Sequence, residues 1–221
     1  MQVVIQQINV YSPAACKKIN AKSGSFCREP FNLQSFRGGG ICTDMIYEKF
    51  DDIDWITPSS KEFAFYWRSL DQDQLVPRRS SFDPAKISSL LPGIAIYEVK
   101  SVDEIICRLA GTALVDRFGM EVTGMNFLNF WEGERREMAS VAMNECVSKP
   151  CGMFTKLSGV SHSGRAETSL AAGFPLLDDD GTCSRLVFYS SNSDHTNVRI
   201  PREDQMKNLM AEETVFIALD R

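Results

Sequence analysis

Short apolar runs with β-type character dominate the chain from residue 94 onward. IAIYEV (94–99) and EIICRLAGTAL (104–114) are rich in β-branched residues and flank the polar KSVD, which predicts a hairpin. Three later runs have the same character: MFTKLSGV (153–160), ETSLAAGFPLL (167–177) and SRLVFYSS (184–191). Their connections contain glycine, including Asp180-Gly181, a preferred hairpin turn. The pattern predicts five strands joined largely by hairpins.

Helical spacing begins earlier, in PSSKEFAFYWRSL (58–70). Ser59 and Glu62 have the spacing of a capping box. Aromatic and apolar residues recur at i, i+3, i+4 and i+7, namely Phe63, Tyr66, Trp67 and Leu70. Such a stripe most often packs in the core. The functional alternative is that this helix also contacts a second copy of the protein.

Two more helices are expected further along the chain. In residues 132–149, one face carries Met138, Val141, Ala142 and Cys146, and the helix ends before Pro150. Pro201 begins a predicted C-terminal helix with Met206, Leu209 and Met210 on one side. Glycine breaks between residues 116 and 131 indicate short helical turns instead.

The order of these elements predicts the fold class. Strands and helices do not alternate as in βαβ units, so we expect an α+β fold. It consists of a five-stranded antiparallel sheet with helices covering one face, and of flanking N- and C-terminal helices. This arrangement places a cavity between sheet and helices. The expected parts are an N-terminal extension (1–44), a flanking helix and Pro-rich connector (45–92), a core (93–192), and a C-terminal loop and helix (193–221).

Charge separates the first 44 residues from the rest of the chain. They carry five basic and two acidic residues, a net charge of +3, which leaves −8 for the remainder of a chain whose total is −5. They are either a flexible or disordered natural extension, or an over-extended start, with Met45 as the true first residue. The acidic remainder argues against nucleic-acid binding.

Composition and cysteine spacing indicate a globular, cytoplasmic protein. Hydrophobic residues make up 43% and charged residues 24% of the 221 residues. The seven cysteines form no CxxC pair and no regular spacing, so neither a disulfide framework nor a metal site is expected. No apolar run reaches the roughly 18 residues of a membrane span, and the start lacks the order of a signal peptide.

Several short motifs follow one another in a recognisable order: WRSL (67–70), LVPRRSSFDP (75–84), LLP (90–92), CRLAGT (107–112) and FGMEVTG (118–124). Together they resemble the stand-alone PAS family of alphaproteobacteria, PAS_5, over roughly residues 55–192. The resemblance implies a PAS fold. It also implies a small sensory or regulatory module, generally cytoplasmic, that acts through partners or dimerisation and performs no chemistry itself. Few members have assigned ligands, so the resemblance predicts the fold better than the function.

The glycines of FGMEVTGMN do not form a nucleotide site. Gly119 and Gly124 have P-loop spacing, but Met125 and Asn126 replace the lysine and hydroxyl residue that hold phosphates and magnesium. The glycines are expected instead to break the chain into turns. Gly111 is expected to let a strand bend or another backbone approach closely.

Cofactor motifs are incomplete as well. LOV-type flavin domains use a cysteine in a G-x-N-C context, and Phe127 replaces it here, so a photoadduct-forming flavin is disfavoured while simple flavin binding stays open. Haem-binding PAS domains supply a histidine from the long helix, and residues 132–149 contain none. His162 and His195 fall in predicted turns or loops, which disfavours haem.

The sequence contains no complete calcium-binding or catalytic motif. Asp178, Asp179 and Asp180 lack the alternating ligands and the later glutamate of an EF-hand loop, and a hairpin turn explains them better. Cys107 and Cys146 lie on apolar elements, where buried, inert thiols are usual. We therefore expect no catalysis and no metal site.

A pocket between sheet and helices is the best candidate site. Strand alternation places either Ile106, Arg108 and Ala110, or Cys107, Leu109 and Gly111, on the inner face. An arginine in a strand commonly faces solvent, whereas an inward Arg108 would need a carboxylate partner. The expected apolar walls are Phe127, Trp131, Met138, Ala142, Cys146 and Phe188. Filling of this space by side chains alone is an equal alternative.

Arg78 and Arg79 form a candidate anion site, although a solvated pair or a clamp on helix carboxyl ends is the more common role. The sequence shows no output domain after Arg221. The leading hypothesis is therefore a regulator that homodimerises through its aromatic helix and passes a signal to a separate protein. The alternative is a sensor of a small apolar or carboxylated ligand contacted by Arg108. An enzyme that uses a cysteine is a third hypothesis.

Overall fold

The computed structural model describes residues 47–71, 73–192 and 204–219, and the structural statements below concern these residues. The expectations for residues 1–44, for His195 and for Pro201 lie outside this part of the chain. The α-helices of the described residues are Pro58–Arg68 (α1), Thr112–Phe118 (α2) and Glu134–Ser148 (α3). The strands are Tyr47–Lys49 (β1), Ile94–Ser101 (β2), Glu104–Ala110 (β3), Gly152–Ser161 (β4), Ala166–Leu177 (β5), Cys183–Asn192 (β6) and Met206–Ala218 (β7). No helix in these ranges is both long and apolar enough to cross a membrane.

The strands form one sheet in the order β1-β7-β4-β5-β6-β2-β3. All neighbours pair antiparallel except β1 and β7, which are parallel. The five predicted strands are β2 to β6, and they lie side by side in the sheet. The α+β class with a largely antiparallel sheet is therefore confirmed, and two further strands extend the sheet beyond β4.

The predicted C-terminal helix is wrong, because this segment is strand β7. Its ladder with β4 is interrupted by register shifts, one of which leaves Lys207 without a partner between Met206 and Asn208. An extra residue in a strand turns the following side chains to the other face. Met206 and Leu209 thus reach the same side of the sheet although they are three residues apart. This bulge imitates helical spacing in the sequence.

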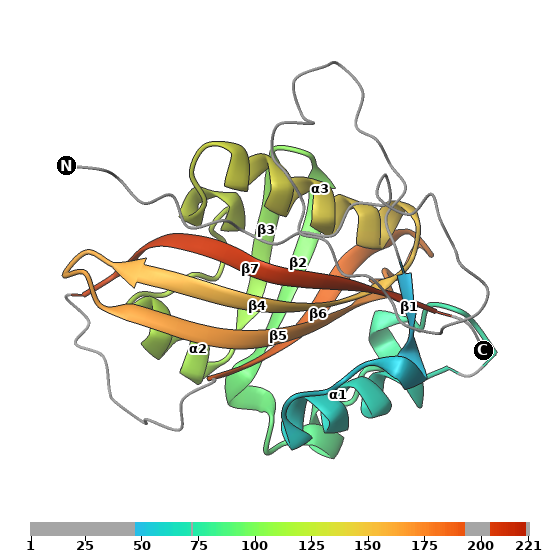
Figure 1. Ribbon diagram of the computed structural model, residues 1–221. Coiled ribbons are helices and arrows are strands. Elements are labelled where there is room, and N and C mark those ends of the chain that lie inside the picture. The colour runs from blue at the N-terminus through green and yellow to red at the C-terminus, as the bar shows by residue number, and fades with distance from the viewer. Residues whose placement is uncertain (1–46, 72, 193–203, 220–221) are drawn as a thin grey trace, which may run out of the picture.

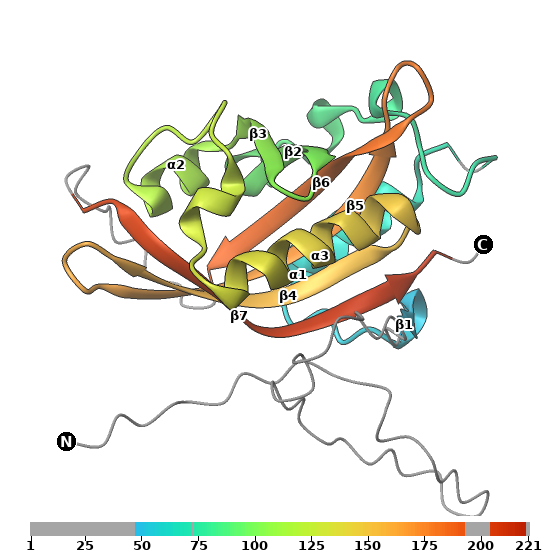
Figure 2. The same cartoon turned by 90° about the horizontal axis from the view of Figure 1, so that it is seen from above.

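Helices cover both faces of the sheet, not one as predicted. In Figures 1 and 2, α3 lies across one face of the twisted sheet and α1 lies against the opposite face. The first face packs against α2, α3 and the 3-10 turn Phe127–Phe130 (η7), and its buried residues include Tyr97, Leu186 and Phe188. The second packs against α1, with Phe174 and Val187 among its buried residues. The molecule has three layers, helix, sheet and helix.

The aromatic stripe of α1 is part of this second core. Trp67 stacks on Phe174 with ring centroids 4.7 Å apart, and its indole nitrogen donates to the carbonyl of Pro175 at 3.0 Å. Phe63 and Leu70 are buried as well. Tyr66 is half-buried, and its hydroxyl donates to the backbone carbonyl of Asp83 at 2.9 Å. Phe63, Trp67 and Leu70 therefore pack in the core of their own chain, and a contact of α1 with a second copy stays a proposal.

The cap of α1 differs from the predicted capping box. The helix begins at Pro58, and Thr57 is the N-cap, whose hydroxyl accepts from the backbone amide of Ser60 at 3.1 Å. Proline at the first helical position lacks only an amide that would have no helical partner. The N-cap therefore lies two residues before Ser59, the N-cap that the spacing had suggested.

Gly111 marks a close approach between two segments, as predicted. The strand expected over residues 104–114 ends at Ala110, and α2 follows directly. A Cβ on Gly111 would overlap the backbone carbonyl oxygens of Leu91 and Pro92. Only glycine fits where these carbonyls face the start of α2.

Gly119 ends α2 in the left-handed conformation, with φ of 68°. The loop that follows returns to β3. The Gly124 amide donates to the Cys107 carbonyl at 2.7 Å, and the Cys107 amide donates to the Met125 carbonyl at 2.9 Å. The glycines of this stretch are therefore turn and contact positions along the edge of the sheet.

Candidate functional site

Aromatic side chains occupy the layer between the sheet and α3. The Tyr97 ring lies 4.8 Å from that of Phe127 and 5.7 Å from that of Phe188, measured between centroids. Trp131 joins the group with its ring 5.7 Å from Phe127. Three predicted wall residues, Phe127, Trp131 and Phe188, thus meet in one cluster, which we call the aromatic layer.

Tyr97 connects the cluster, and the prediction omitted it. It alternates with Ala95 and Val99 on the inner face of β2, a pattern visible in IAIYEV. Burial raises the pKa of Tyr97, so its hydroxyl stays protonated at all physiological pH values. It can therefore both donate and accept a hydrogen bond.

Of the remaining predicted wall residues, three belong to the core on the α3 side or pack against it, and Met138 does not. Cys146 is buried in the same core, and Ala110 and Ala142 pack against it while partly exposed. Met138 is only half-buried, and Met143 is the methionine of α3 that enters the core. The polar edge of the layer is the indole nitrogen of Trp131, which is buried and has no hydrogen-bond partner among the described residues.

Arg108 does not face the layer, so the inward alternative that made it a pocket candidate is not supported, and the solvent-facing alternative describes it. The ladder of β2 and β3 passes from Ile96 opposite Leu109 to Tyr97 opposite Cys107, which leaves Arg108 in a bulge. Cys107 is buried in the inner core, whereas Arg108 is half-exposed and its Nε donates to Glu98 at 2.6 Å. The bulge returns Ala110 to the inner side.

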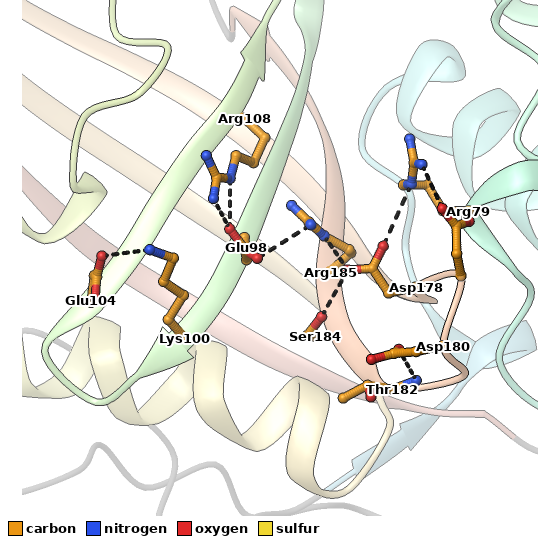
Figure 3. Close-up of polar contacts among 11 residues, drawn as sticks. Arg79, Glu98, Lys100, Glu104, Arg108, Asp178, Asp180, Thr182, Ser184 and Arg185 are labelled. Carbon is orange, nitrogen blue, oxygen red and sulfur yellow. Dashed lines mark hydrogen bonds and ion pairs between the residues drawn. The ribbon is translucent and has the colours of Figure 1, made fainter.

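Arg108 belongs to a row of alternating charges on the other face of the sheet, shown in Figure 3. Glu98 also pairs with Arg185 at 3.2 Å, and Arg185 pairs with Asp178 at 2.8 Å. Asp178 in turn lies 3.7 Å from the guanidinium of Arg79. The hydrogen bond from Arg185 is the main cause that lowers the pKa of Asp178. Cations and carboxylates already satisfy one another here, so the row supports the sheet and needs no ligand.

The candidate anion site at Arg78 and Arg79 is not supported. The Arg79 guanidinium also pairs with Asp179 at 3.3 Å, so its charge is already compensated. Arg78 is exposed, and its backbone amide donates to Asp71 at 3.0 Å. Asp180 forms the expected hairpin turn, in which its carboxylate accepts from the Thr182 amide at 2.8 Å.

A second group of charges lies beside α2 and had no signal in the sequence. Arg117 is buried, donates to the Ser190 hydroxyl at 2.7 Å and lies 3.9 Å from Glu167. Burial lowers the pKa of Arg117. Glu167 pairs with Arg165 at 2.9 Å, and Arg165 lies 3.3 Å from Asp204, whose pKa falls to about 2 chiefly through the hydrogen bond from Ser163. The group joins α2 to the β4–β5 hairpin.

Comparisons with solved structures return light-oxygen-voltage domains. The light-state structure of the blue-light photoreceptor Aureochrome1 LOV is 15% identical, with 50% of this chain and 88% of that chain covered and a TM-score of 0.38. A LOV domain studied with a flavin analogue is 12% identical, with 50% and 84% covered and a TM-score of 0.40. The Rhodobacter sphaeroides LOV protein is 10% identical, with 52% and 71% covered and a TM-score of 0.39. No curated protein matches the chain.

These matches correct the expectation that a photoadduct-forming flavin is disfavoured. The matched chains are LOV domains by title, and one title names a flavin analogue. At 10–15% identity the likeness concerns the fold, and it assigns no cofactor to this chain.

The family comparison agrees with the topology. Residues 56–187 match the PAS_5 model, described as a PAS domain, and this segment holds α1, most of the sheet, and Phe127 and Trp131 of the aromatic layer. The match spans more than half of the chain and includes the motifs from WRSL to FGMEVTG. The chain belongs to the PAS_5 family of PAS domains.

Proposed function

We propose that this protein is a sensory and regulatory PAS protein that acts through homodimerisation and a signalling partner, and that it catalyses no reaction itself. The observation that carries this proposal is the PAS match over residues 56–187. The state of the thiols supports the absence of catalysis. Burial raises the pKa of Cys107 to about 11 and that of Cys183 to about 11, so neither is a ready nucleophile at neutral pH.

The functional unit of the proposal extends over residues 47–219. The segments outside the expected core of residues 93–192 supply α1, which buries Trp67 against one face, and β7, which lies between β1 and β4. A shorter unit would expose these surfaces. The unit that we propose to respond to a signal is therefore the sheet together with the helices that cover its two faces.

The surface for a second copy is proposed to include the outer side of α1. Phe65 is 46% exposed and lies on the side of the helix opposite the buried Phe63 and Trp67. Ile56, just before the helix, is 60% exposed. A second copy that covers these side chains would remove apolar surface from water, which is favourable.

Light scattering of the full chain at micromolar concentration tests this surface. We expect a dimer for the wild type, a monomer for Phe65→Glu, and a dimer for Val102→Glu. Val102 is the matched control because it is 62% exposed in the turn between β2 and β3. Dissociation by both variants, or by neither, would contradict the proposed surface.

A ligand sensor is the second candidate function, and the Trp131 indole favours it. A buried donor without a partner costs free energy, and a ligand oxygen or ring nitrogen beside the aromatic layer would satisfy it. Absorption spectroscopy and mass spectrometry of small molecules released from natively purified protein test this function. A flavin or another bound compound would support it, provided that Trp131→Phe yields less of that compound or none. Protein that yields no compound would contradict it.

A further inference from the structure

Two buried thiols are in contact where α3 ends and β4 begins. Cys146 lies in the last turns of α3 and Cys151 directly precedes β4, and they are 1% and 2% exposed. The Cys151 thiol is directed at the Cys146 sulfur, and the two sulfurs are 3.7 Å apart. The Cys151 amide also lies 3.4 Å from the Cys146 carbonyl.

We propose that Cys146 and Cys151 form an oxidant-sensitive dithiol that closes to a disulfide, a modification site through which the protein responds to peroxides. A disulfide requires the sulfurs to approach to about 2.05 Å. The last helical turn and the short connection through Pro150 are the only backbone that must adjust, because the two cysteines are five residues apart. Contact between the sulfurs gives each thiol a high local concentration of the other.

The reaction needs one equivalent of a peroxide. Hydrogen peroxide oxidises one thiol to a sulfenic acid and is reduced to water in forming it. The second thiol then attacks the oxidised sulfur, the S–S bond forms, and a second water leaves. In total the protein loses two hydrogen atoms.

Burial makes this a slow site at neutral pH. The side-chain hydrogen bond shared with Cys151, together with burial, raises the pKa of Cys146 well above its usual value. Since the thiolate is the reactive form, the oxidation rate should rise with pH. The site would then record sustained oxidant exposure and ignore brief exposure.

Formation of the disulfide would weaken the contact between α3 and β1. Glu145, adjacent to Cys146, accepts a hydrogen bond from the Tyr47 hydroxyl at 2.6 Å and pairs with Lys149 at 3.1 Å. Tyr47 begins β1, which pairs with β7. Movement of Cys146 toward Cys151 displaces the turn that carries Glu145, so oxidation weakens this contact.

Peptide mapping of the full-length protein tests the site. The protein is treated with hydrogen peroxide, its remaining thiols are alkylated, and it is digested with trypsin. Trypsin does not cleave Lys149 before Pro150, so one peptide, Glu137–Lys156, contains both thiols and no other cysteine. We expect this peptide unalkylated and two hydrogen atoms lighter after peroxide, and restored to the alkylated form by prior reduction.

Two variants provide the controls. Cys183→Ser should keep the change, whereas Cys151→Ser should lose it. Alkylation of both thiols after peroxide treatment of the wild type would overturn the proposal. So would a crosslink from this peptide to Ala166–Arg185, which contains Cys183. If Cys151→Ser does not fold, the wild-type map alone decides.

Discussion

Gly111 follows the end of β3 and lies against the backbone carbonyls of Leu91 and Pro92, in the 3-10 turn before β2. Its amide donates to the Ile94 carbonyl at 2.7 Å, which ties it to the start of β2. The atoms that a Cβ would meet belong to the backbone of Leu91 and Pro92, so no side-chain rotation relieves the overlap. A single methyl group at this position therefore forces two backbone segments apart.

We expect Gly111→Ala to lower the free energy of unfolding by about 2 kcal/mol, within the range for overpacking. Urea denaturation of purified protein measures this loss. Gly181→Asn is the control, since nothing lies within 4 Å of a Cβ there and asparagine tolerates its φ of 84°. Equal stability of Gly111→Ala and the wild type would mean that the close approach is absent.

Asp178 should make the fold sensitive to acid. Its pKa is lowered in the folded state, chiefly by the hydrogen bond from Arg185. In the unfolded chain the carboxyl has its ordinary pKa of about 3.9. Its contribution to stability is thus complete above that pH and is lost as the pH falls through the lower, folded-state pKa.

The melting temperature between pH 6 and pH 2.5 measures this effect. Asp178→Asn should be less stable than the wild type at pH 6, and the difference should narrow as the pH falls. Glu104→Gln removes a carboxylate from the exposed pair with Lys100 and should follow the wild-type curve. A constant difference between Asp178→Asn and the wild type over the whole range would contradict the argument.

Arg108 shows why residue-level predictions of a site fail. Alternation in β3 offered two sets of inward residues, and neither set is the real one. The bulge at Arg108 combines Cys107 from one set with Ala110 from the other. Bulges depend on the partner strand, which a single sequence does not reveal. Phe127, Trp131 and Phe188 were predictable because they are large and apolar and belong to different elements that face the same layer.

Among the elements, α1 leaves the widest choice of roles when only its sequence is considered. The sequence predicted the helix within two residues of its start and identified its aromatic stripe. It could not distinguish packing against the chain's own sheet from packing against a second copy, because both bury the same side chains. The second face of the sheet, where Trp67 stacks on Phe174, shows the packing within the chain, and a contact of α1 with a second copy stays a proposal.

Two substitutions on α1 separate the buried stripe from the exposed side. Trp67→Ala should cost about 3–5 kcal/mol of unfolding free energy, as expected for removal of a buried aromatic side chain. Phe65→Ala should cost less than about 1 kcal/mol, because the side chain is half-exposed. Thermal or chemical denaturation gives both values. Similar losses for the two variants would show that α1 does not pack as described.

β7 was mispredicted for a different physical reason. Its register shifts give Met206 and Leu209 the three-residue spacing of a helix face. The bounds of strands β2 to β6 agree with the prediction within a few residues, although the ladder of β2 and β3 also contains a bulge. In β7 the extra residue lies between two large apolar side chains, and this gives them helical spacing.

The whole molecule is a sheet enclosed between two helical layers, each with its own apolar core. The aromatic layer with Trp131 lies on the α3 side, and Phe65 is exposed on the α1 side. The Cys146–Cys151 pair lies where the α3 layer meets the sheet. The sheet lies between the layer and thiols on one side and the proposed dimer surface on the other.

Native mass spectrometry of the full chain, purified without denaturation and sprayed from a micromolar solution, tests the central proposal most directly. The chain has a mass of 24.8 kDa. The account predicts a dominant species of twice that mass, with any bound compound visible as an added mass on the same species. A monomer of 24.8 kDa as the only species over the micromolar range would contradict the proposal that this PAS protein acts through homodimerisation.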